Sequence, residues 1–286
     1  MRALVQLTPL DPAYPTRLRH LDGAPPSLTT RGGSLEAECA VAVVGSRAAV
    51  PAAREFAGTL ARALVAARAV VVSGGAEGID AAAHQGALEA GGRTWVVAPT
   101  GHGQCFPPCH ESLFEAIAGG PGAMLWPFAD GYQHRSAFLA RNRVLAALSD
   151  AVVVVQAGMS SGALHAASCA RQLNKPLWVV PAAPWMEEFA GSRQLLEAGA
   201  LPLMSIDLFL SSLARDRASG GQRAAPTRIL SENESIVLSA LSNAPLHIDF
   251  IAVRAKRAAH ETAAALLTLA LENVVVEGPP GFFRRQ

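Results

Sequence analysis

Short apolar runs alternate with longer amphipathic stretches along the first two thirds of the chain. Six runs rich in β-branched residues recur at wide spacing, at residues 41–45, 70–73, 94–98, 123–126, 152–155 and 177–181. The intervening stretches are rich in alanine and leucine with helical spacing, as at residues 52–67, 79–89 and 164–173. This alternation predicts β-α-β units, and a run of four valines at 152–155 is typical of a parallel strand covered on both faces. We therefore predict a doubly wound, mostly parallel α/β domain over residues 39–214.

The remaining segments predict a linker, a small second domain and an N-terminal extension. Residues 215–228 are polar, contain glycine and proline and lack an apolar period, which is typical of a linker. Within residues 229–286, three short apolar-periodic stretches precede a Gly-Pro-Pro-Gly turn between two apolar runs, which predicts three helices and a hairpin in a winged-helix arrangement. Residues 1–38 are rich in proline and too short for a core of their own. We expect them to pack on the main domain.

Composition and charge limit the size of the core and the kinds of molecule that the chain can bind. Half of the 286 residues are hydrophobic and 16% are charged, which allows one large core and a small second one. The formal net charge of +1 gives no whole-molecule attraction for polyanions, so a nucleic-acid site must come from locally clustered arginines. No segment reaches the roughly 18 apolar residues of a membrane span, and the N-terminus does not resemble a signal peptide. With four scattered cysteines that we expect to be reduced, the chain is predicted to be cytoplasmic and without membrane association.

The turn after the first predicted strand of the main domain is a candidate anion site. The strand ends in Gly45-Ser46-Arg47, and a helix follows after Pro51. In a doubly wound sheet such a turn lies at the carboxyl edge, where ligands bind, and its backbone amides suit a phosphate. The turn lacks the three-glycine dinucleotide fingerprint and the Walker lysine; Arg47 instead supplies a full charge beside the amides. The alternative is an ordinary tight turn with a solvated arginine.

Two other groups of residues raise the question of catalysis or metal binding. A glycine-rich stretch after the second predicted strand leads to Asp80 and His84, but helix capping by Asp80 and packing explain both residues, and no nucleophile stands at suitable spacing. Four potential zinc ligands fall within nine positions, namely His102, Cys105, Cys109 and His110. Their spacing does not match a usual zinc site. We therefore expect no catalytic residues, no metal and no cofactor.

The segment 134–143 places four arginine or histidine side chains and an aromatic residue within ten positions of a charge-poor chain. It combines one histidine and three arginines with one aromatic residue, Phe138. Guanidinium groups pair with phosphates, and an exposed phenyl ring stacks on an unpaired base with about 1–3 kcal/mol, whichever base it is. A solvated helix face with Phe138 in the core is the alternative, and the residues alone do not decide between the two.

A second glycine-containing turn follows the fifth predicted strand of the main domain. Residues 157–164 open another helix at the same edge of the sheet, and Ser161 there suits a phosphate oxygen. As a nucleophile Ser161 lacks the Gly-x-Ser-x-Gly context and has no evident base or orienting acid. The turn is therefore a second candidate for anion binding.

These motifs occur together in the order and spacing of the DNA-processing protein A family, also called DprA or Smf, which the chain resembles over most of residues 1–205. The motifs that carry the resemblance are residues 44–47, residues 73–80 with His84, residues 138–143 and residues 161–162. The resemblance implies an extended Rossmann-like fold that binds single-stranded DNA. It also implies a homodimer that protects incoming DNA and loads the RecA recombinase onto it during natural transformation, without catalytic turnover.

Carried over by position, the resemblance assigns roles to ten residues. Arg47 would bind phosphate, Arg135 would occupy the basic position just before the aromatic residue, and Phe138 would stack on a base. Three residues of the same helix would frame the pocket: Arg141, Asn142 and Arg143. Four residues at the two turns would complete it through the amides around them: Gly45, Ser46, Ser161 and Gly162. One departure is Glu77, which stands where many members have arginine and lowers the local positive potential.

Two other classes of function remain open. Related Rossmann domains include nucleoside-monophosphate phosphoribohydrolases, whose Pro-Gly-Gly-x-Gly-Thr turn is absent from this chain. A nucleotide-binding sensor module would instead use Gly45 to Arg47 to hold a small phosphate ligand. Release of base from nucleotides would establish the first class, and mononucleotide binding that blocks DNA would favour the second.

Overall fold

The chain folds into two compact units, Met1–Arg215 and Asp216–Gln286. The computed structural model describes residues 2–19, 21, 27–131, 137–218, 231–241, 245–271, 274–278 and 281–285. The first unit contains a nine-stranded sheet and the second a three-stranded one.

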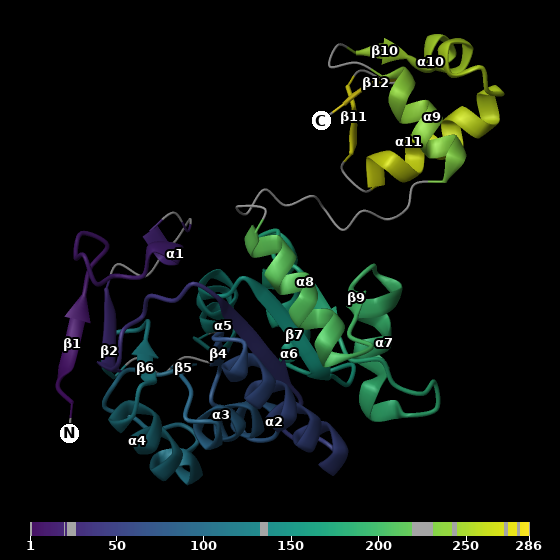
Figure 1. Ribbon diagram of the computed structural model, residues 1–286. Helices are drawn as coiled ribbons and strands as arrows, with labels where there is room; N and C mark the ends of the chain where they lie inside the picture. The colour runs from purple at the N-terminus through teal and green to yellow at the C-terminus, as the bar shows by residue number, and fades with distance from the viewer. Residues whose placement is uncertain are drawn as a thin grey trace. The chain divides into compact units, whose positions relative to one another are not determined.

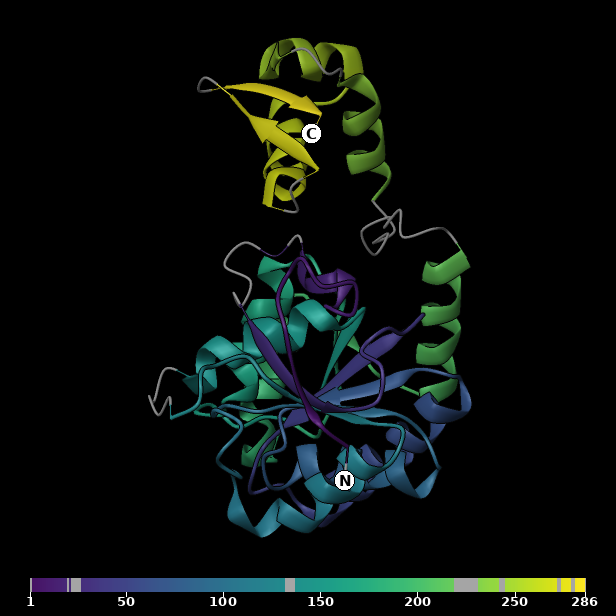
Figure 2. The ribbon, with the colours of Figure 1, turned by 90° about the vertical axis from the view of Figure 1, so that its left-hand side faces the viewer.

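A mostly parallel sheet forms the centre of the first unit (Figures 1 and 2). Its strands are β1 (Leu4–Leu7), β2 (Leu28–Gly32), β3 (Ala40–Gly45), β4 (Val70–Ser73), β5 (Thr94–Val97), β6 (Ala123–Trp126), β7 (Ala151–Gln156), β8 (Leu177–Val179) and β9 (Leu201–Pro202). Their spatial order is β1-β2-β6-β5-β4-β3-β7-β8-β9, with antiparallel pairing only for β1–β2 and β2–β6. The order of strands reverses between β3 and β7, and ligands of such sheets bind outside the carboxyl ends at this switch point.

Helices cover both faces of the sheet, as the ribbon views show (Figures 1 and 2). The helices are α1 (Thr16–Arg19), α2 (Pro51–Ala66), α3 (Ile79–Glu89), α4 (Glu111–Gly119), α5 (Ala137–Leu148), α6 (Ala163–Gln172), α7 (Ala190–Glu197) and α8 (Ile206–Ala218), with 3-10 turns η1 (Pro108–His110) and η2 (Glu187–Phe189). Alternate residues of β3 enter two cores: Ala42 and Val44 pack with α5 and α6, and Val41 and Val43 pack with α2, α3 and α8. This confirms the predicted Rossmann-like sheet, and all six predicted strands are present as β3 to β8.

The N-terminal segment contributes two strands and a short helix that the sequence pattern did not indicate. β2 pairs with β6 and so extends the central sheet, and β1 pairs with β2. Tyr14 and Leu18 are fully buried in the core beneath α5. The Nη2 atom of Arg17 lies 2.8 Å from Oδ2 of Asp150, which also accepts the backbone N–H of Ala40. These contacts fix the segment beside the start of β3.

The second unit confirms the expected winged-helix region. Three helices, α9 (Glu232–Ala240), α10 (Ile248–Ala255) and α11 (Ala259–Leu271), pack around a small core. A sheet in the order β10-β12-β11 joins them, formed by β10 (Leu246–His247), β11 (Val275–Glu277) and β12 (Phe282–Arg285). A reciprocal capping box starts α9: Ser231 accepts the N–H of Glu234, and the Glu234 carboxylate accepts the N–H of Ser231.

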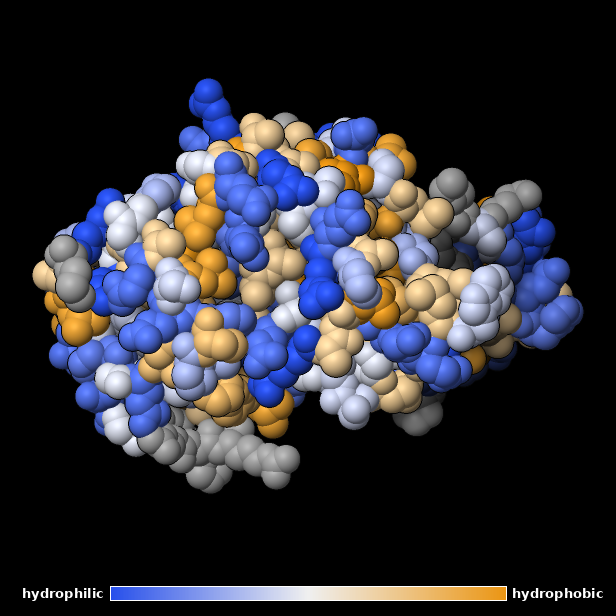
Figure 3. All heavy atoms as spheres, turned by 90° about the horizontal axis from the view of Figure 1, so that it is seen from below, coloured by the Kyte–Doolittle hydropathy of each residue, from blue (hydrophilic) through white to orange (hydrophobic). Residues whose placement is uncertain are grey.

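The described helices are too short or too polar to cross a membrane. Seen from below, the surface carries hydrophobic side chains in small groups between hydrophilic ones (Figure 3). This mixture is ordinary for helices whose outer faces contact water.

Candidate functional site

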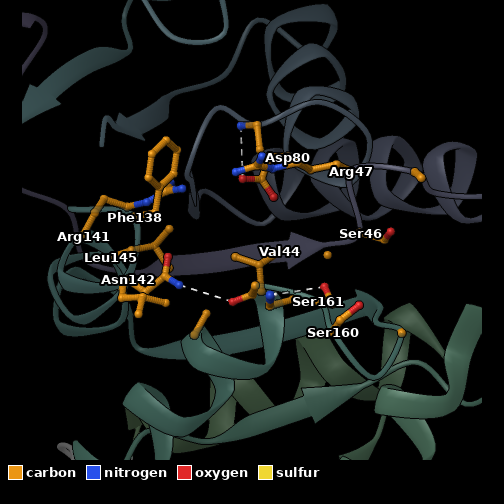
Figure 4. A pocket seen from close by; sticks show the side chains of 18 residues that line it. Val44, Ser46, Arg47, Asp80, Phe138, Arg141, Asn142, Leu145, Ser160 and Ser161 are labelled. Carbon is orange, nitrogen blue, oxygen red and sulfur yellow. Dashed lines mark hydrogen bonds between the residues drawn. The ribbon is translucent and has the colours of Figure 1, made fainter. Parts of the chain in front are cut away.

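A cavity of about 410 Å³ opens at the carboxyl ends of β3 and β7, where the strand order reverses. We call it the first cavity. Side chains of α5 form one side, Arg47 and Asp80 a second, and Ser160 and Ser161 a third (Figure 4). Segments more than 100 residues apart along the chain thus meet at one edge of the sheet.

The turn after β3 is held by backbone packing that leaves two amides free. A Cβ atom on Gly45 would lie 2.5 Å from a side-chain carbon of Ile79, so only glycine fits there. The N–H of Ser46 donates to the carbonyl of Gln156 at 2.8 Å, which removes it from the expected set of anion-binding donors. Within the described part of the chain, the backbone N–H groups of Arg47 and Ala48 have no hydrogen-bond partner. These two amides are the donors that the turn offers to a ligand.

In the turn before α6, some hydrogen-bonding groups are used within the turn itself and one backbone N–H is left for a ligand. The N–H of Ser161 donates to the carbonyl of Gly158, and the Ser161 hydroxyl accepts the N–H of Ala163 at 3.3 Å. The side-chain amide of Asn142 donates to the carbonyl of Gly162, which ties α5 to this turn. Among the described residues, no partner is found for the N–H of Gly162, which stands at the positive end of α6.

An aromatic ring and a guanidinium group face each other across the first cavity. The guanidinium carbon of Arg47 lies 5.5 Å from the centre of the half-buried Phe138 ring, a cation–π arrangement. The ring of Phe106 meets Phe138 edge-on, with ring centres 5.2 Å apart. Phe138 is therefore neither fully in the core nor fully exposed, and Arg47 covers part of its accessible surface.

Arg141 and Asp80 are both buried beneath the cavity, where their opposite charges influence each other. The side chain of Arg141 donates to the carbonyl of Val97 at 3.0 Å, and the residue is only 6% exposed. Asp80 does not cap α3, contrary to expectation; its Oδ2 accepts the backbone N–H groups of Gly74 and Ala76. Burial raises the pKa of Asp80 above its ordinary value, and the nearby Arg141 opposes that rise. The two residues support the glycine-rich turn after β4.

Comparisons with known proteins agree on one family. Residues 6–214 match the family described as DNA recombination-mediator protein A, and residues 221–281 match the DprA winged helix domain. The chain belongs to the DNA recombination-mediator protein A family. Protein Smf of Synechocystis is 37% identical over 72% of this chain and 53% of its own length, and the DNA processing protein DprA of Streptococcus pneumoniae is 34% identical over 67% and 68%. The match thus spans only about half the length of the first of these relatives.

Solved structures of the DNA processing protein A family share this fold. DNA processing protein A from Helicobacter pylori aligns with a TM-score of 0.68 at 31% identity, over 76% of this chain and 99% of that one. That structure was solved to explain how the Helicobacter pylori protein binds single-stranded DNA. The DprA structure from Streptococcus pneumoniae also aligns with a TM-score of 0.68, at 32% identity over 73% of this chain and 74% of that one. Both alignments cover a length close to that of the first unit.

The structure gathers eight of the ten residues to which the resemblance to DNA processing protein A assigned a role. The eight that line the first cavity are Gly45, Ser46, Arg47, Phe138, Arg141, Asn142, Ser161 and Gly162. Arg143 does not line it; its charge lies close to Cys169 of α6. Arg135 lies outside the described residues. Asp80 also lines the cavity, a position that the sequence signalled only through its glycine-rich surroundings.

The other polar groups singled out in the sequence have structural contacts. His84 is fully buried with Nδ1 2.7 Å from the hydroxyl of Thr94, and burial lowers its pKa to about 3, so its imidazole is neutral at neutral pH. Nδ1 of His110 lies 2.9 Å from the carbonyl of Gly75. Within the described ranges, no three His, Cys, Asp or Glu side chains are grouped to hold a metal ion.

Proposed function

We propose that this chain binds single-stranded DNA in the first cavity and acts as a recombination mediator that protects DNA and loads RecA onto it. The observation that carries the proposal is the meeting of the Arg47 guanidinium, three backbone amides without a partner among the described residues, and the Phe138 ring in one cavity at the switch point of the sheet. Phosphate binding needs the charge and the amides, and sequence-independent binding of an unpaired base needs the ring.

In the proposed binding mode, Arg47 and the backbone amides bind a phosphate, and Phe138 binds a base. A phosphate would accept hydrogen bonds from the amides of Arg47, Ala48 and Gly162 and pair with the Arg47 guanidinium. The Phe138 ring would stack on the adjoining base once the guanidinium turns from the ring toward the phosphate. Duplex DNA offers no free base face to this ring, so the arrangement favours single strands.

We also propose that the chain performs no catalysis on the DNA. The Ser161 hydroxyl accepts a backbone N–H, and the Asp80 carboxylate accepts two, so both groups are committed to supporting turns. His84 and His110 are engaged with Thr94 and with the carbonyl of Gly75. Such hydrogen bonds stabilise the conformation of a binding surface and do not activate a nucleophile.

The test of this proposal is a fluorescence-anisotropy titration with labelled single-stranded and duplex oligonucleotides at several salt concentrations. We expect tighter binding of the single strand and an affinity that falls as salt rises, with a log–log slope of about −0.7 for each phosphate contacted. Equal binding of duplex, or mononucleotide binding that displaces DNA, would instead support a winged-helix or small-ligand site.

We propose that the chain forms a homodimer through an exposed apolar surface near the C-terminal end of the sheet. Met204, on the connection between β9 and α8, and Leu208, in the first turn of α8, are 72% and 65% exposed. Trp185, on the connection after the neighbouring strand β8, is 82% exposed. Large apolar side chains that are exposed on connections of neighbouring strands favour an interaction site at this side of the sheet. An isologous dimer would bury them twice.

Replacing Leu208 with glutamate is expected to convert the dimer into a monomer, because the charge must be desolvated in the apolar interface. Sedimentation velocity at several concentrations measures this change, and we expect the dimer dissociation constant to rise by at least about tenfold. Leu10→Glu, at a leucine that is 92% exposed on a different segment, is the matched control. A dimer equally stable in both variants would place the interface elsewhere.

A further inference from the structure

A second cavity, of about 230 Å³, lies at the same carboxyl edge of the sheet, at the ends of β5 and β6. It is formed between β6, the chain around Phe106 and one face of α4. Phe106 belongs to its lining, and the ring of Phe106 also meets Phe138 of the first cavity edge-on at 5.2 Å. One aromatic pair therefore separates the two cavities.

Aromatic rings form part of the lining of the second cavity. Phe114 and Trp126 are 5% and 6% exposed, and they line the cavity together with Phe106, which is 39% exposed. Flat aromatic and apolar side chains on several sides are the surroundings in which proteins hold unstacked bases.

The polar groups of the second cavity include both donors and acceptors. The guanidinium of Arg31 is paired with the carboxylate of Glu115. The carboxylate of Glu111, one helical turn before Glu115, has no hydrogen-bond or ion-pair partner among the described residues. Gln104 adds a side-chain amide. Two carboxylates beside one arginine disfavour a phosphate, whereas a base edge offers donors and acceptors of its own.

We infer that the second cavity is a base-binding subsite for a further nucleotide of the single strand held in the first cavity, selective for bases with an exocyclic amino group. The inference rests on the proposed function. Glu111 accepts a hydrogen bond from the amino group of cytosine, as carboxylates do in other protein–DNA contacts, and thymine has no such group. Phe138 then binds any base, and the Glu111 subsite adds a preference at a neighbouring position.

The experiment compares affinities for oligodeoxycytidylate and oligodeoxythymidylate of equal length, each labelled and measured by fluorescence anisotropy. For the native chain we expect cytosine to be favoured by about tenfold, which corresponds to the lower part of the range for one base contact. In Glu111→Gln, whose amide can pair with either base, we expect the ratio to fall to about one, because thymidylate gains a contact while cytidylate keeps one. Glu55→Gln, on the exposed surface of α2 and outside both cavities, should keep the native ratio.

The outcomes separate this subsite from the proposed function. Equal affinity of the native chain for the two oligonucleotides would overturn the subsite while single-stranded DNA binding stands. The same conclusion would follow if Glu111→Gln kept the ratio of cytidylate to thymidylate affinity that the native chain shows. Binding of neither oligonucleotide would overturn both. Because Glu111 is exposed and without a partner among the described residues, its replacement by glutamine is expected to leave the fold unchanged.

Discussion

Arg47→Glu is expected to weaken single-stranded DNA binding by at least about 100-fold. Losing one side of a desolvated charge contact costs about 2–5 kcal/mol, and about 1.4 kcal/mol corresponds to a tenfold change in affinity. The new carboxylate would also repel the phosphate that the free amides of Arg47 and Ala48 are placed to bind. Because Arg47 is exposed and its guanidinium only stacks on Phe138, the substitution leaves the core intact. The measurement is the anisotropy titration described above.

Two controls make the Arg47 result specific to the site. Arg68→Glu makes the same change of charge at an exposed position just before β4, at the opposite edge of the sheet, and should change affinity little. Arg47→Lys keeps the charge but loses the planar guanidinium that can bind a phosphate through two parallel hydrogen bonds, so an intermediate loss is expected. If Arg68→Glu weakens binding as much as Arg47→Glu does, the effect comes from overall charge, and the first cavity is not the binding site.

The central sheet could be predicted because its strands carry apolar residues on both faces. In β3, Val41 and Val43 enter one core while Ala42 and Val44 enter the other, a pattern visible in the sequence. β1 and β2 could not be predicted in the same way. Three of the four residues of β1 are exposed, and β2 depends on pairing with β6, more than 90 residues away. Such long-range pairing leaves no local signal in a proline-rich segment.

The candidate site could be predicted where residues able to bind an anion directly follow the carboxyl ends of predicted strands. Arg47 follows β3, and ligands of a doubly wound sheet bind at the carboxyl ends of its strands. Arg47 accordingly lines the first cavity. Arg141 and Arg143 lie two residues apart in α5, and nothing local distinguishes them. Arg141 is buried because Val97 and Asp80, from other parts of the sheet edge, supply its partners. The charge of Arg143 acts instead on Cys169 of α6, so the environment of Arg143 depends on tertiary packing.

Gly74→Ala is expected to destabilise the first unit by about 3 kcal/mol, the upper part of the range for losing a hydrogen bond to a buried charged group. A Cβ atom on Gly74 would lie 1.4 Å from a guanidinium nitrogen of Arg141, so the two cannot coexist. Displacing Arg141 breaks its hydrogen bond to Val97 and removes the nearby positive charge that favours the ionised form of buried Asp80. All four tryptophans lie in the first unit, so their fluorescence during urea unfolding measures this unit directly. Gly119→Ala, where an added Cβ meets nothing within 4 Å, should change stability by no more than about 0.5 kcal/mol.

A double-mutant cycle distinguishes this mechanism from a local backbone effect at Gly74. If the cost of Gly74→Ala arises from expelling Arg141, it should largely vanish in the Arg141→Ala background, where no guanidinium occupies the space beside Gly74. Arg141→Ala itself should also be destabilising, because it removes the cation that faces Asp80. Additive losses would show that Arg141 moves aside without cost and that the backbone at Gly74 carries the strain. A strongly non-additive result would identify the Gly74–Arg141–Asp80 contact as one structural unit beneath the cavity.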